Sequence, residues 1–478
     1  MKYDEINFGK ATGEQEGAHI PELLRMGFID KGNVLKKLRD EDRFLVLGYK
    51  GSGKSTIAEK IRLESFPEDQ TSKYIAKIQH LGDFPFKSFA KIFSGQAEPE
   101  AKYPSTWSYL INLLIIGSLV KDAAFYYSEN NGFREKVERL QQLGLLPTED
   151  LKQLVVKSSK SSFKVQLPKV IEYMREDKTE IKDNDLLFLH IIESLNDMIK
   201  GFIATKKHLI VLDGLDDVLT TRELQYTSLS ALVYEVNKIN YAFARDRTNV
   251  KIIVLCRSEL YERLPGPNKN KIKQDSAIVL DWYHDPRDPE NSMLVRLANL
   301  RAGIAVKGEI DIFSTYFPNT FNEKVIAHFL LDNTRHTPRD FLQLLANLQP
   351  FYQGNKFSRS NILSGLRHYS LEYFMPEIKD EVVGYVEFEK FEQFVSLLNI
   401  AKLREFKLDL LDRISKENSI LDLTTIVEIL EALYDCSAIG CKWQNDRYEF
   451  KFRNRNSSFN KEVTIVLHHG LWKSLNLV

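Results

Sequence analysis

Cysteine is scarce in this chain: its 478 residues include three, Cys256, Cys436 and Cys441. Three thiols cannot form the disulfide framework of a small secreted domain, so we expect reduced thiols. Cys436 and Cys441 stand five positions apart, but no second pair and no neighbouring histidine completes a set of zinc ligands. The sequence therefore predicts no zinc site there.

The chain also lacks net charge and a long apolar run. Its 66 Lys and Arg residues balance 66 Asp and Glu residues, which excludes a protein that coats nucleic acid with its whole surface. The most apolar stretch, 107–120, is shorter than the roughly 20 residues of a membrane span and predicts a buried helix. The polar, acidic opening MKYDEINFGK is unlike a secretory leader. We expect a soluble, cytoplasmic protein with no membrane partner.

Short apolar segments alternate with helical patterns through the first 285 residues. Such strands are typical of a parallel sheet that is covered on both faces, so the predicted fold class is α/β. The predicted strands are 43–48, 74–81, 208–214, 249–256 and 275–283.

The first of these strands runs into the sequence GYKGSGKS, which matches G-x-x-x-x-G-K-[ST] at every position. Gly48, Gly51 and Gly53 allow the backbone to curl so that its N–H groups point inward at phosphate oxygens. Lys54 would bind the β- and γ-phosphates and Ser55 would ligate Mg²⁺, at the positive end of the following helix. The pattern predicts a nucleotide site for ATP and Mg²⁺, with Ser52 and Thr56 completing the loop.

Three acids follow the predicted strand 208–214. Asp213 lies at its carboxyl end, where open parallel sheets bind ligands, and we expect it to hold Mg²⁺ beside Ser55. Asp216 and Asp217 come within one further turn, and either can orient or deprotonate an attacking water. Asp217 is the preferred base and Asp216 the alternative.

The remaining pattern predicts four regions. Residues 1–30 form a segment that packs near the nucleotide, and 31–285 form a P-loop core with a helical insertion at about 100–185. Residues 286–375 read as a helical lid. Residues 376–478 contain helices, the hairpin sequence AIGCKWQNDRYEFKFR and a final strand, which together indicate a winged helix.

The segment LIVLDGLDD resembles the extended Walker B motif of STAND-type signalling ATPases, although Asp stands where that motif has Glu. STAND and related AAA+ proteins carry a polar or arginine sensor after the next strand, and this resemblance makes Arg257 a catalytic candidate. Pro338 resembles the STAND lid proline, and Arg339 resembles the sensor arginine of origin-recognition-type AAA+ proteins. Thr337 and Pro338 have the residue types that begin a helix.

The sequence IVLHHGLWKSL resembles the histidine motif that ends the STAND winged helix. In that class the histidine contacts the β-phosphate of ADP, which implies that role for His468, with His469 as the alternative. The N-terminal FGKATGEQEGAHIPELLRMGFID, taken with the phosphate loop, is similar to a group of bacterial P-loop ATPases, some of which are encoded among antiviral defence genes.

The C-terminal residues leave a DNA contact open. From 437 to 478 there are seven Lys or Arg and three acids, a net charge of 7 − 3 = +4. Strict alternation in RYEFKFR predicts the aromatic residues on one face and Arg447, Glu449, Lys451 and Arg453 on the other. Such a face is either exposed to solvent or able to bind the phosphate backbone of a DNA duplex.

Three functions compete at this point. The first is an ATPase switch that responds to ATP or ADP and acts through a protein effector or through self-association. The second is a DNA-dependent ATPase or loader. The third is a phosphotransferase, which is disfavoured because the sequence shows no compact basic lid for a second phosphoryl substrate.

Overall fold

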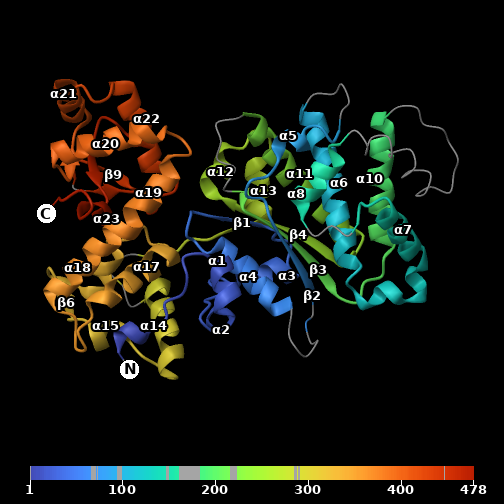
Figure 1. The fold of residues 1–478 in the computed structure, drawn as a ribbon, viewed down its shortest axis with the longest axis horizontal. Helices are drawn as coiled ribbons and strands as arrows, with labels where there is room; N and C mark the ends of the chain where they lie inside the picture. Colours follow the sequence, from blue (N-terminus) through green and yellow to red (C-terminus); the bar gives the residue numbers. More distant parts are fainter. Residues whose placement is uncertain are drawn as a thin grey trace.

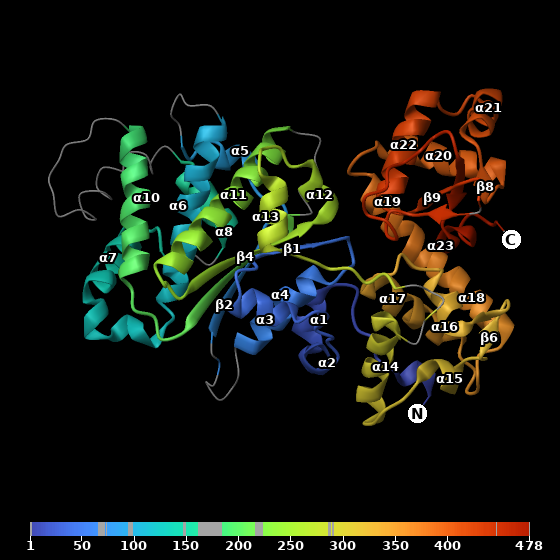
Figure 2. The same cartoon turned by 180° about the vertical axis from the view of Figure 1, so that it is seen from behind.

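The computed structural model describes residues 2–65, 72, 74–93, 99–146, 150–160, 184–215, 223–284, 288, 291–445 and 447–477. These residues form two halves. One contains a central sheet and the helical insertion, and the other contains the lid helices and the C-terminal domain (Figures 1 and 2). The N-terminus lies in the second half, beside α14 and α15.

A five-stranded parallel sheet, in the order β2-β3-β4-β1-β5, forms the centre of the first half. Its strands are β1 (Leu45–Gly48), β2 (Tyr74–His80), β3 (Lys207–Asp213), β4 (Val250–Arg257) and β5 (Ala277–Val279). All five predicted strands are present, and the predicted α/β class is confirmed. β5 is shorter than predicted at both ends, because helix α13 continues to Ser276 and the strand stops at Val279.

Alternate residues of the central strands enter two separate cores. In β3, Leu209 and Val211 pack against α3 (Val34–Asp40) and α4 (Lys54–Ser65). Ile210 and Leu212 face the opposite side of the sheet. That side is covered by α6 (Pro99–Leu119), α10 (Asn184–Gly201), α11 (Glu223–Arg245), α12 (Ser258–Arg263) and α13 (Lys269–Ser276).

The helical insertion packs on this second face. It contains α5 (Phe86–Phe89), α6, η2 (Ala123–Tyr126), η3 (Ser128–Asn130), α7 (Asn131–Gln142) and α8 (Leu151–Ser158). The apolar stretch 107–120 lies largely in α6 and is buried, as predicted, and Trp107 Nε1 donates to Ser228 O at 2.9 Å. In the described ranges no helix has the length and apolar content to cross a membrane.

The second half begins with the predicted lid helices. They are α14 (Met293–Val306), α15 (Ile312–Tyr316), the strands β6 (Thr320–Phe321) and β7 (Lys324–Val325), α16 (Ile326–Leu331), α17 (Pro338–Leu348), η6 (Gln349–Phe351) and α18 (Arg359–Tyr369). From α18 the chain continues through one π-helical turn, η7 (Ser370–Phe374), into α19 (Met375–Val382). The predicted lid boundary at 375 therefore falls inside a continuous helical run.

The C-terminal domain has the element order of a winged helix. It contains α20 (Phe388–Ala401), β8 (Glu405–Phe406), α21 (Leu408–Asn418), α22 (Leu423–Asp435), β9 (Ile439–Lys442), β10 (Tyr448–Glu449), β11 (Thr464–Leu467) and α23 (His469–Trp472). The strands pair antiparallel in the order β10-β9-β11-β8. This domain and the lid share one hydrophobic core.

The predicted alternation in the wing is wrong. β10 ends at Glu449, so strict two-residue periodicity does not extend through the hairpin. Tyr448 is 38% exposed, whereas Glu449 is buried and accepts hydrogen bonds from Trp443 Nε1 and Arg447 Nη2. Phe450 and Phe452 are buried.

The N-terminal segment crosses from one half to the other. The residues of η1 (Tyr3–Glu5) and the stretch that follows it enter the lid core through Tyr3, Ile6 and Phe8. The chain then forms α1 (Gly13–His19), which packs on α4, and α2 (Pro21–Met26). One continuous segment of the chain thus contacts both sides of the space between the halves.

Candidate nucleotide site

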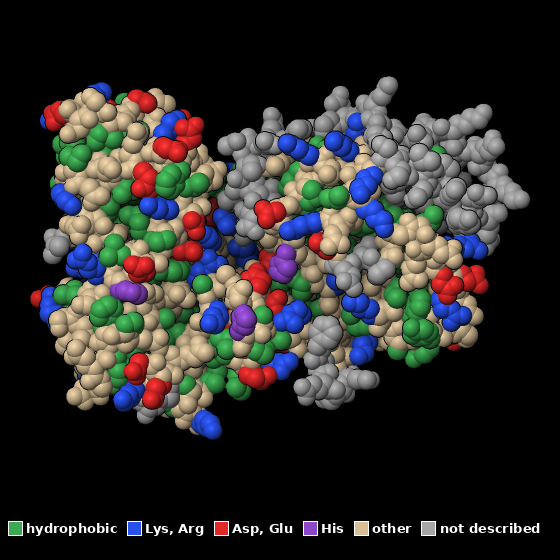
Figure 3. Space-filling view, in the orientation of Figure 1, with side chains coloured by type: hydrophobic (Ala, Val, Ile, Leu, Met, Phe, Trp, Pro, Cys, Tyr) green, Lys and Arg blue, Asp and Glu red, His purple; other side chains and the backbone are tan. Residues whose placement is uncertain are grey.

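A cavity of about 1170 Å³ lies between the two halves. Figure 3 shows it as a hollow in which Lys and Arg side chains gather. Four parts of the chain line it: the N-terminal segment, the loop before α4, the carboxyl edge of the sheet and the lid helices. The predicted site residues on its walls are Gly51, Ser52, Gly53, Lys54, Ser55, Thr56, Asp213, Arg257, Pro338 and Arg339.

The loop between β1 and α4 has the backbone that its glycines predict. Gly51 and Gly53 have φ values of +80° and +94°, a region that side-chain-bearing residues rarely adopt. A Cβ on Gly48 would lie 2.3 Å from Ser52 Oγ, so a side chain at this position would displace the Ser52 hydroxyl. The Lys54 ammonium donates to Gly48 O at 3.0 Å and to Tyr49 O at 3.1 Å.

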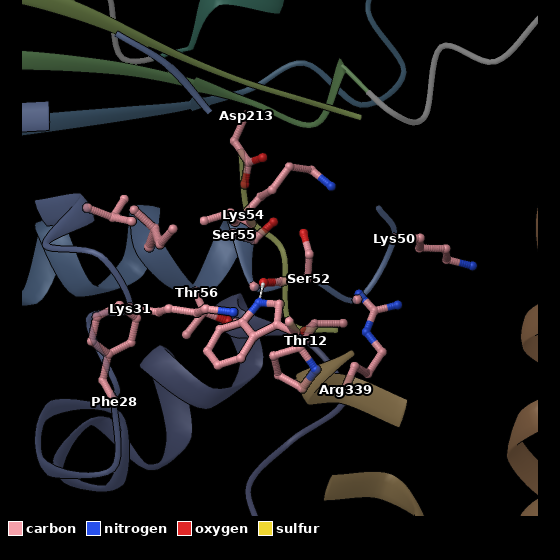
Figure 4. A pocket seen from close by; sticks show the side chains of 18 of the residues that line it. Thr12, Phe28, Lys31, Lys50, Ser52, Lys54, Ser55, Thr56, Asp213 and Arg339 are labelled. Carbon is pink, nitrogen blue, oxygen red and sulfur yellow. Dashed lines mark hydrogen bonds between the residues drawn. The ribbon is translucent and has the colours of Figure 1, made fainter. Parts of the chain in front are cut away.

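Trp282 holds the loop from the side of β5. Its Nε1 donates to Ser52 O at 2.8 Å, as the dashed line in Figure 4 shows. The Ser52 hydroxyl is buried and makes no hydrogen bond within the described chain. Gly48 lies behind the loop and contributes its carbonyl to Lys54 but no surface to the cavity.

Asp213 lies at the carboxyl end of β3 and is 2% exposed. Its side chain points toward Lys54 and Ser55 at the start of α4 (Figure 4). Its Oδ1 accepts from Gly214 N at 2.8 Å, and Gly214 has a φ of +77°. Asp216 and Asp217, the two candidate bases, lie outside the described residues.

The lid contacts the phosphate loop through its backbone. Thr337 caps α17 by accepting from Asp340 N, and Pro338 is the first helical residue, as predicted. Arg339 N donates to Gly51 O at 3.3 Å. The start of the lid helix is therefore in direct contact with the loop.

Side chains join the same two parts. Glu377 of α19 accepts from Arg339 Nη1 at 3.3 Å and pairs with Lys50 Nζ at 3.1 Å. Lys50 belongs to the phosphate loop and Arg339 to the lid. One carboxylate thus neutralises two cations at the edge of the cavity.

Arg257 ends β4 and lines the cavity, and its role as a sensor stays a prediction. Two residues later Glu259 lies beside a small second cavity that Tyr49 and Glu381 also line. Burial raises the pKa of Glu259 to about 7, against the opposing effect of the Arg257 and Lys54 charges. Its Oε2 has no hydrogen-bond partner within the described part of the chain.

His468 lies away from the cavity. Its Nδ1 accepts from Gly470 N at 3.0 Å and caps α23, and its ring stacks on Phe374 with centroids 5.0 Å apart. Burial lowers its pKa well below the usual value. The structure does not bring His468 to the other predicted site residues. Its neighbour His469 is in edge contact with Trp472.

Several lining residues were not predicted. Glu14 from α1 and His80 from β2 converge on Asp213, and Phe28, Lys31 and Trp282 form another part of the wall. His80 had a usable signal, because it ends a strand at the same sheet edge as Asp213. Nothing local in the sequence places Glu14 there, since its position depends on how α1 packs against α4.

The comparisons with known proteins found distant similarity. No family model matches the chain. The putative transposon gamma-delta 80.3 kDa protein of Escherichia coli (strain K12) is 22% identical over 506 aligned positions, which cover 98% of this chain and 67% of that protein.

Two solved structures are similar over most of the chain. The Orc1 protein of Aeropyrum pernix, determined in complex with DNA, is 13% identical, with 96% of this chain and 92% of that chain covered and a TM-score of 0.37. Cdc6p of Pyrobaculum aerophilum is 12% identical, with 98% and 96% covered and a TM-score of 0.29. Likeness at this level supports no conclusion about activity or partners.

Proposed function

We propose that this chain is an ATPase that uses nucleotide binding to set the position of its lid. One observation carries the proposal: the glycine-curled loop, the Lys54 ammonium and the Asp213 carboxylate face one cavity, and the lid helix contacts the loop across it. The loop and Lys54 offer hydrogen-bond donors to a polyphosphate, and the Asp213 carboxylate offers a ligand to the cation that the polyphosphate carries. It also gives the lid a direct means of responding to the nucleotide.

The phosphate loop, Ser55 and Asp213 fit ATP with a divalent cation such as Mg²⁺. The loop presents backbone N–H groups without a Cβ in the way at Gly51 and Gly53, and Lys54 supplies one positive charge. Ser55 and Asp213 offer the hard oxygen ligands that Mg²⁺ prefers. The ion, when bound, would neutralise phosphate charge and hold the triphosphate in line.

The chain's own groups have separate tasks in this proposal. Lys54 binds the β- and γ-phosphates, and Asp217, with Asp216 as the alternative, accepts the proton of the attacking water. Arg257 and Arg339 stabilise negative charge that develops on the γ-phosphate. Asp213 itself is 2% exposed, so its carboxylate would meet the cation at the floor of the cavity.

The lid contacts give this ATPase the character of a switch. Arg339 and Lys50 share Glu377, and a γ-phosphate would compete for the same two cations. Binding therefore exchanges an internal ion pair for a ligand contact and changes the position of α17 relative to the loop. A protein effector and a defence role remain predictions from the resemblance alone.

The test is the affinity of the Lys54→Ala variant for a fluorescent ATP analogue, measured by titration. Affinity should fall about 100-fold or more, which corresponds to ~2.7 kcal/mol, because the β- and γ-phosphate charge loses its buried partner. Lys60→Ala is the matched control, since Lys60 lies on the same helix, outside the cavity, and pairs with Glu64. Equal affinity in the two variants would refute the proposal.

A DNA-dependent ATPase is the second candidate, favoured by the winged-helix element order and by the transposon origin of the relative. The ion pairs of the C-terminal domain weigh against it, because five of its seven predicted basic residues already face acids. These pairs are Lys442–Glu405, Arg447–Glu449, Lys451–Asp435, Arg453–Asp332 and Arg455–Asp281. Duplex DNA should leave the rate of ATP hydrolysis unchanged under the switch proposal and raise it several-fold under this one.

A phosphotransferase would release a phosphorylated acceptor in place of free phosphate. Counting phosphate released per ATP consumed separates this third function from both ATPases. We expect one phosphate for each ATP.

A further inference from the structure

Three side chains from three separate elements converge at the phosphate end of the cavity. They are Glu14 of α1, His80 of β2 and Asp213 of β3, and their ligand atoms all lie within 4.8 Å of one another. His80 Nδ1 is 3.8 Å from Asp213 Oδ2. Ligands about 2.1 Å from one ion lie at most about 4.2 Å apart, so small side-chain movements would close this set around a cation.

We propose that Glu14, His80 and Asp213 form a divalent-cation site in which the N-terminal segment supplies one ligand. This inference rests on the proposed function, because it assigns two further ligands to the cation of the same nucleotide site. Of these three residues only Asp213 was expected to serve that cation, together with Ser55. Glu14 and His80 belong to parts of the chain outside the phosphate-loop and Walker B motifs.

The packing of α1 against α4 in the P-loop core fixes the position of Glu14. A Cβ on Gly13 would lie 2.7 Å from Thr56 N, so α1 begins in direct contact with the backbone of α4. Thr12 caps α1 by accepting from Gln15 N at 3.3 Å. Glu14 is thereby held close to the end of the phosphate loop.

A buried ion pair between α1 and the lid helix α14 fixes the other side of the N-terminal segment. Glu16 accepts from Arg301 Nη2 at 2.6 Å and from Arg301 Nη1 at 2.9 Å, and both side chains are about 95% buried. Arg301 also donates to Phe8 O at 2.6 Å. Because a broken buried pair costs several kcal/mol, residues 8–16 have one well-defined path past the cavity.

The electrostatics of the cluster favour a cation in addition to the Lys54 ammonium that Asp213 already faces. Two carboxylates with oxygens this close repel each other, and Asp213 is almost fully withdrawn from water. A bound divalent ion removes that cost and uses both acids as ligands. His80 is largely exposed, so its ring can turn toward the ion without disturbing the core.

The histidine defines the class of cation. Mg²⁺ prefers oxygen ligands only, whereas Mn²⁺ and its transition-metal neighbours accept imidazole nitrogen together with carboxylate oxygen. We therefore assign to this site a preference for a transition-metal divalent ion over Mg²⁺, with His80 as the selecting residue.

The experiment titrates the nucleotide-free protein with Mn²⁺ and follows the ion by electron paramagnetic resonance. Wild-type protein should bind Mn²⁺ more tightly than Mg²⁺ in competition, and the bound ion should show coupling to one ring nitrogen. Glu14→Gln should weaken Mn²⁺ binding at least tenfold. His80→Ala should remove the nitrogen coupling and most of the preference over Mg²⁺.

Glu22→Gln is the matched control, because Glu22 lies on the neighbouring helix α2, pairs with Arg25 and does not line the cavity. Mn²⁺ affinity that is equal in wild type, Glu14→Gln and Glu22→Gln, or nitrogen coupling that persists in His80→Ala, would overturn the proposal. His80 is exposed, so that variant should fold normally even if replacement of Glu14 disturbs α1.

Binding of the ATP analogue is measured on the same variants in metal-free buffer. Loss of the Mn²⁺ signal with normal, Lys54-dependent ATP binding would contradict the cation site alone. Normal Mn²⁺ binding with ATP binding that is insensitive to Lys54 would contradict the proposed function alone.

Discussion

At the scale of single residues, the carboxyl group of Glu259 lies in a buried environment that disfavours its ionised form. Its Oε2 is buried without a hydrogen bond in the part of the chain that is described, and burial raises its pKa to about 7. In the unfolded chain an ordinary glutamate pKa is near 4.3. The folded protein therefore binds one more proton than the unfolded chain between these two values.

This difference predicts a loss of stability as the pH rises. In the folded protein the side chain stays neutral up to about pH 7, whereas the unfolded chain loses its proton near pH 4.5. The free energy of unfolding should therefore fall as the pH rises from about 4.5 to about 7 and level off above 7. We expect a loss of about 2 kcal/mol, less than the full change in pKa implies, because the residue is not fully buried. Urea denaturation at pH 5 and pH 8 measures it.

Glu259→Gln removes the titrating group, so its free energy of unfolding should change less between pH 5 and pH 8. The exposed Glu262→Gln on the same helix is the control and should behave as wild type. An unchanged pH dependence in Glu259→Gln would show that Glu259 is ionised in the folded state.

Residue-scale predictions could be made where the spacing of the residues determines their chemistry. The run from Gly48 to Ser55 and the acid at the end of a strand require no knowledge of distant contacts, and the structure brings Lys54, Ser55 and Asp213 together. His468 was placed by resemblance alone, and its burial against Phe374 depends on packing between α23 and η7 that no local pattern reveals.

At the scale of elements, the docking of α1 on α4 depends on a missing side chain. Gly13→Ala would put a Cβ 2.7 Å from Thr56 N, and a backbone atom cannot move aside easily. We expect a loss of about 1–3 kcal/mol in the free energy of unfolding, or local release of α1. Denaturation and hydrogen exchange of residues 13–19 measure both outcomes.

Gly132 provides the matched comparison, because it lies in α7 and a Cβ there would meet nothing within 4 Å. Gly132→Ala should stabilise the protein by about 0.4–1 kcal/mol through the lower entropy of the unfolded chain. If Gly13→Ala were as stable as Gly132→Ala, α1 would not be as closely docked as the structure shows.

Apolar patterns predicted most elements because buried strands and helices have distinct periods. They failed in the hairpin at β10, where the alternation of RYEFKFR extends beyond the strand. Pairing to β9 ends at Glu449, and within this short strand Tyr448 is exposed and Glu449 is buried. The length of a two-residue strand is decided by its partner and is not encoded in its own alternation.

At the scale of the whole molecule, Glu377 connects the C-terminal half to the phosphate loop. Glu377→Gln would release Lys50 and Arg339 from their shared carboxylate. We expect the affinity for the ATP analogue to rise about three- to tenfold, equivalent to ~0.6–1.4 kcal/mol, because Arg339 becomes available to the phosphates and Lys50 keeps only its 4.0 Å contact with Glu381.

Glu372→Gln is the control for this variant, since Glu372 lies in the same helical run but is exposed. Titration of both variants with the analogue decides the point. Affinity that falls in Glu377→Gln would mean that this carboxylate supports the bound state, and the competition described above would be wrong.

Long-range assembly explains what the sequence alone could not supply. Glu14 and His80 are 66 positions apart, and Asp213 follows a further 133 positions later. Their meeting depends on the strand order β2-β3 and on α1 lying across the start of α4. The pattern of apolar residues predicts each strand but does not state which strands are neighbours.

The path of the N-terminal segment sets a limit on how far the two halves can separate. Phe8 is anchored in the lid core and Gly13 on α4, and the four residues between them reach at most about 18 Å when fully extended. These four residues form a short tether between the two halves. A wider opening must pull Phe8 out of the lid core or detach α1 from α4, and the second event would carry Glu14 away from Asp213. In that case the two halves could not open fully without also separating the three ligands Glu14, His80 and Asp213.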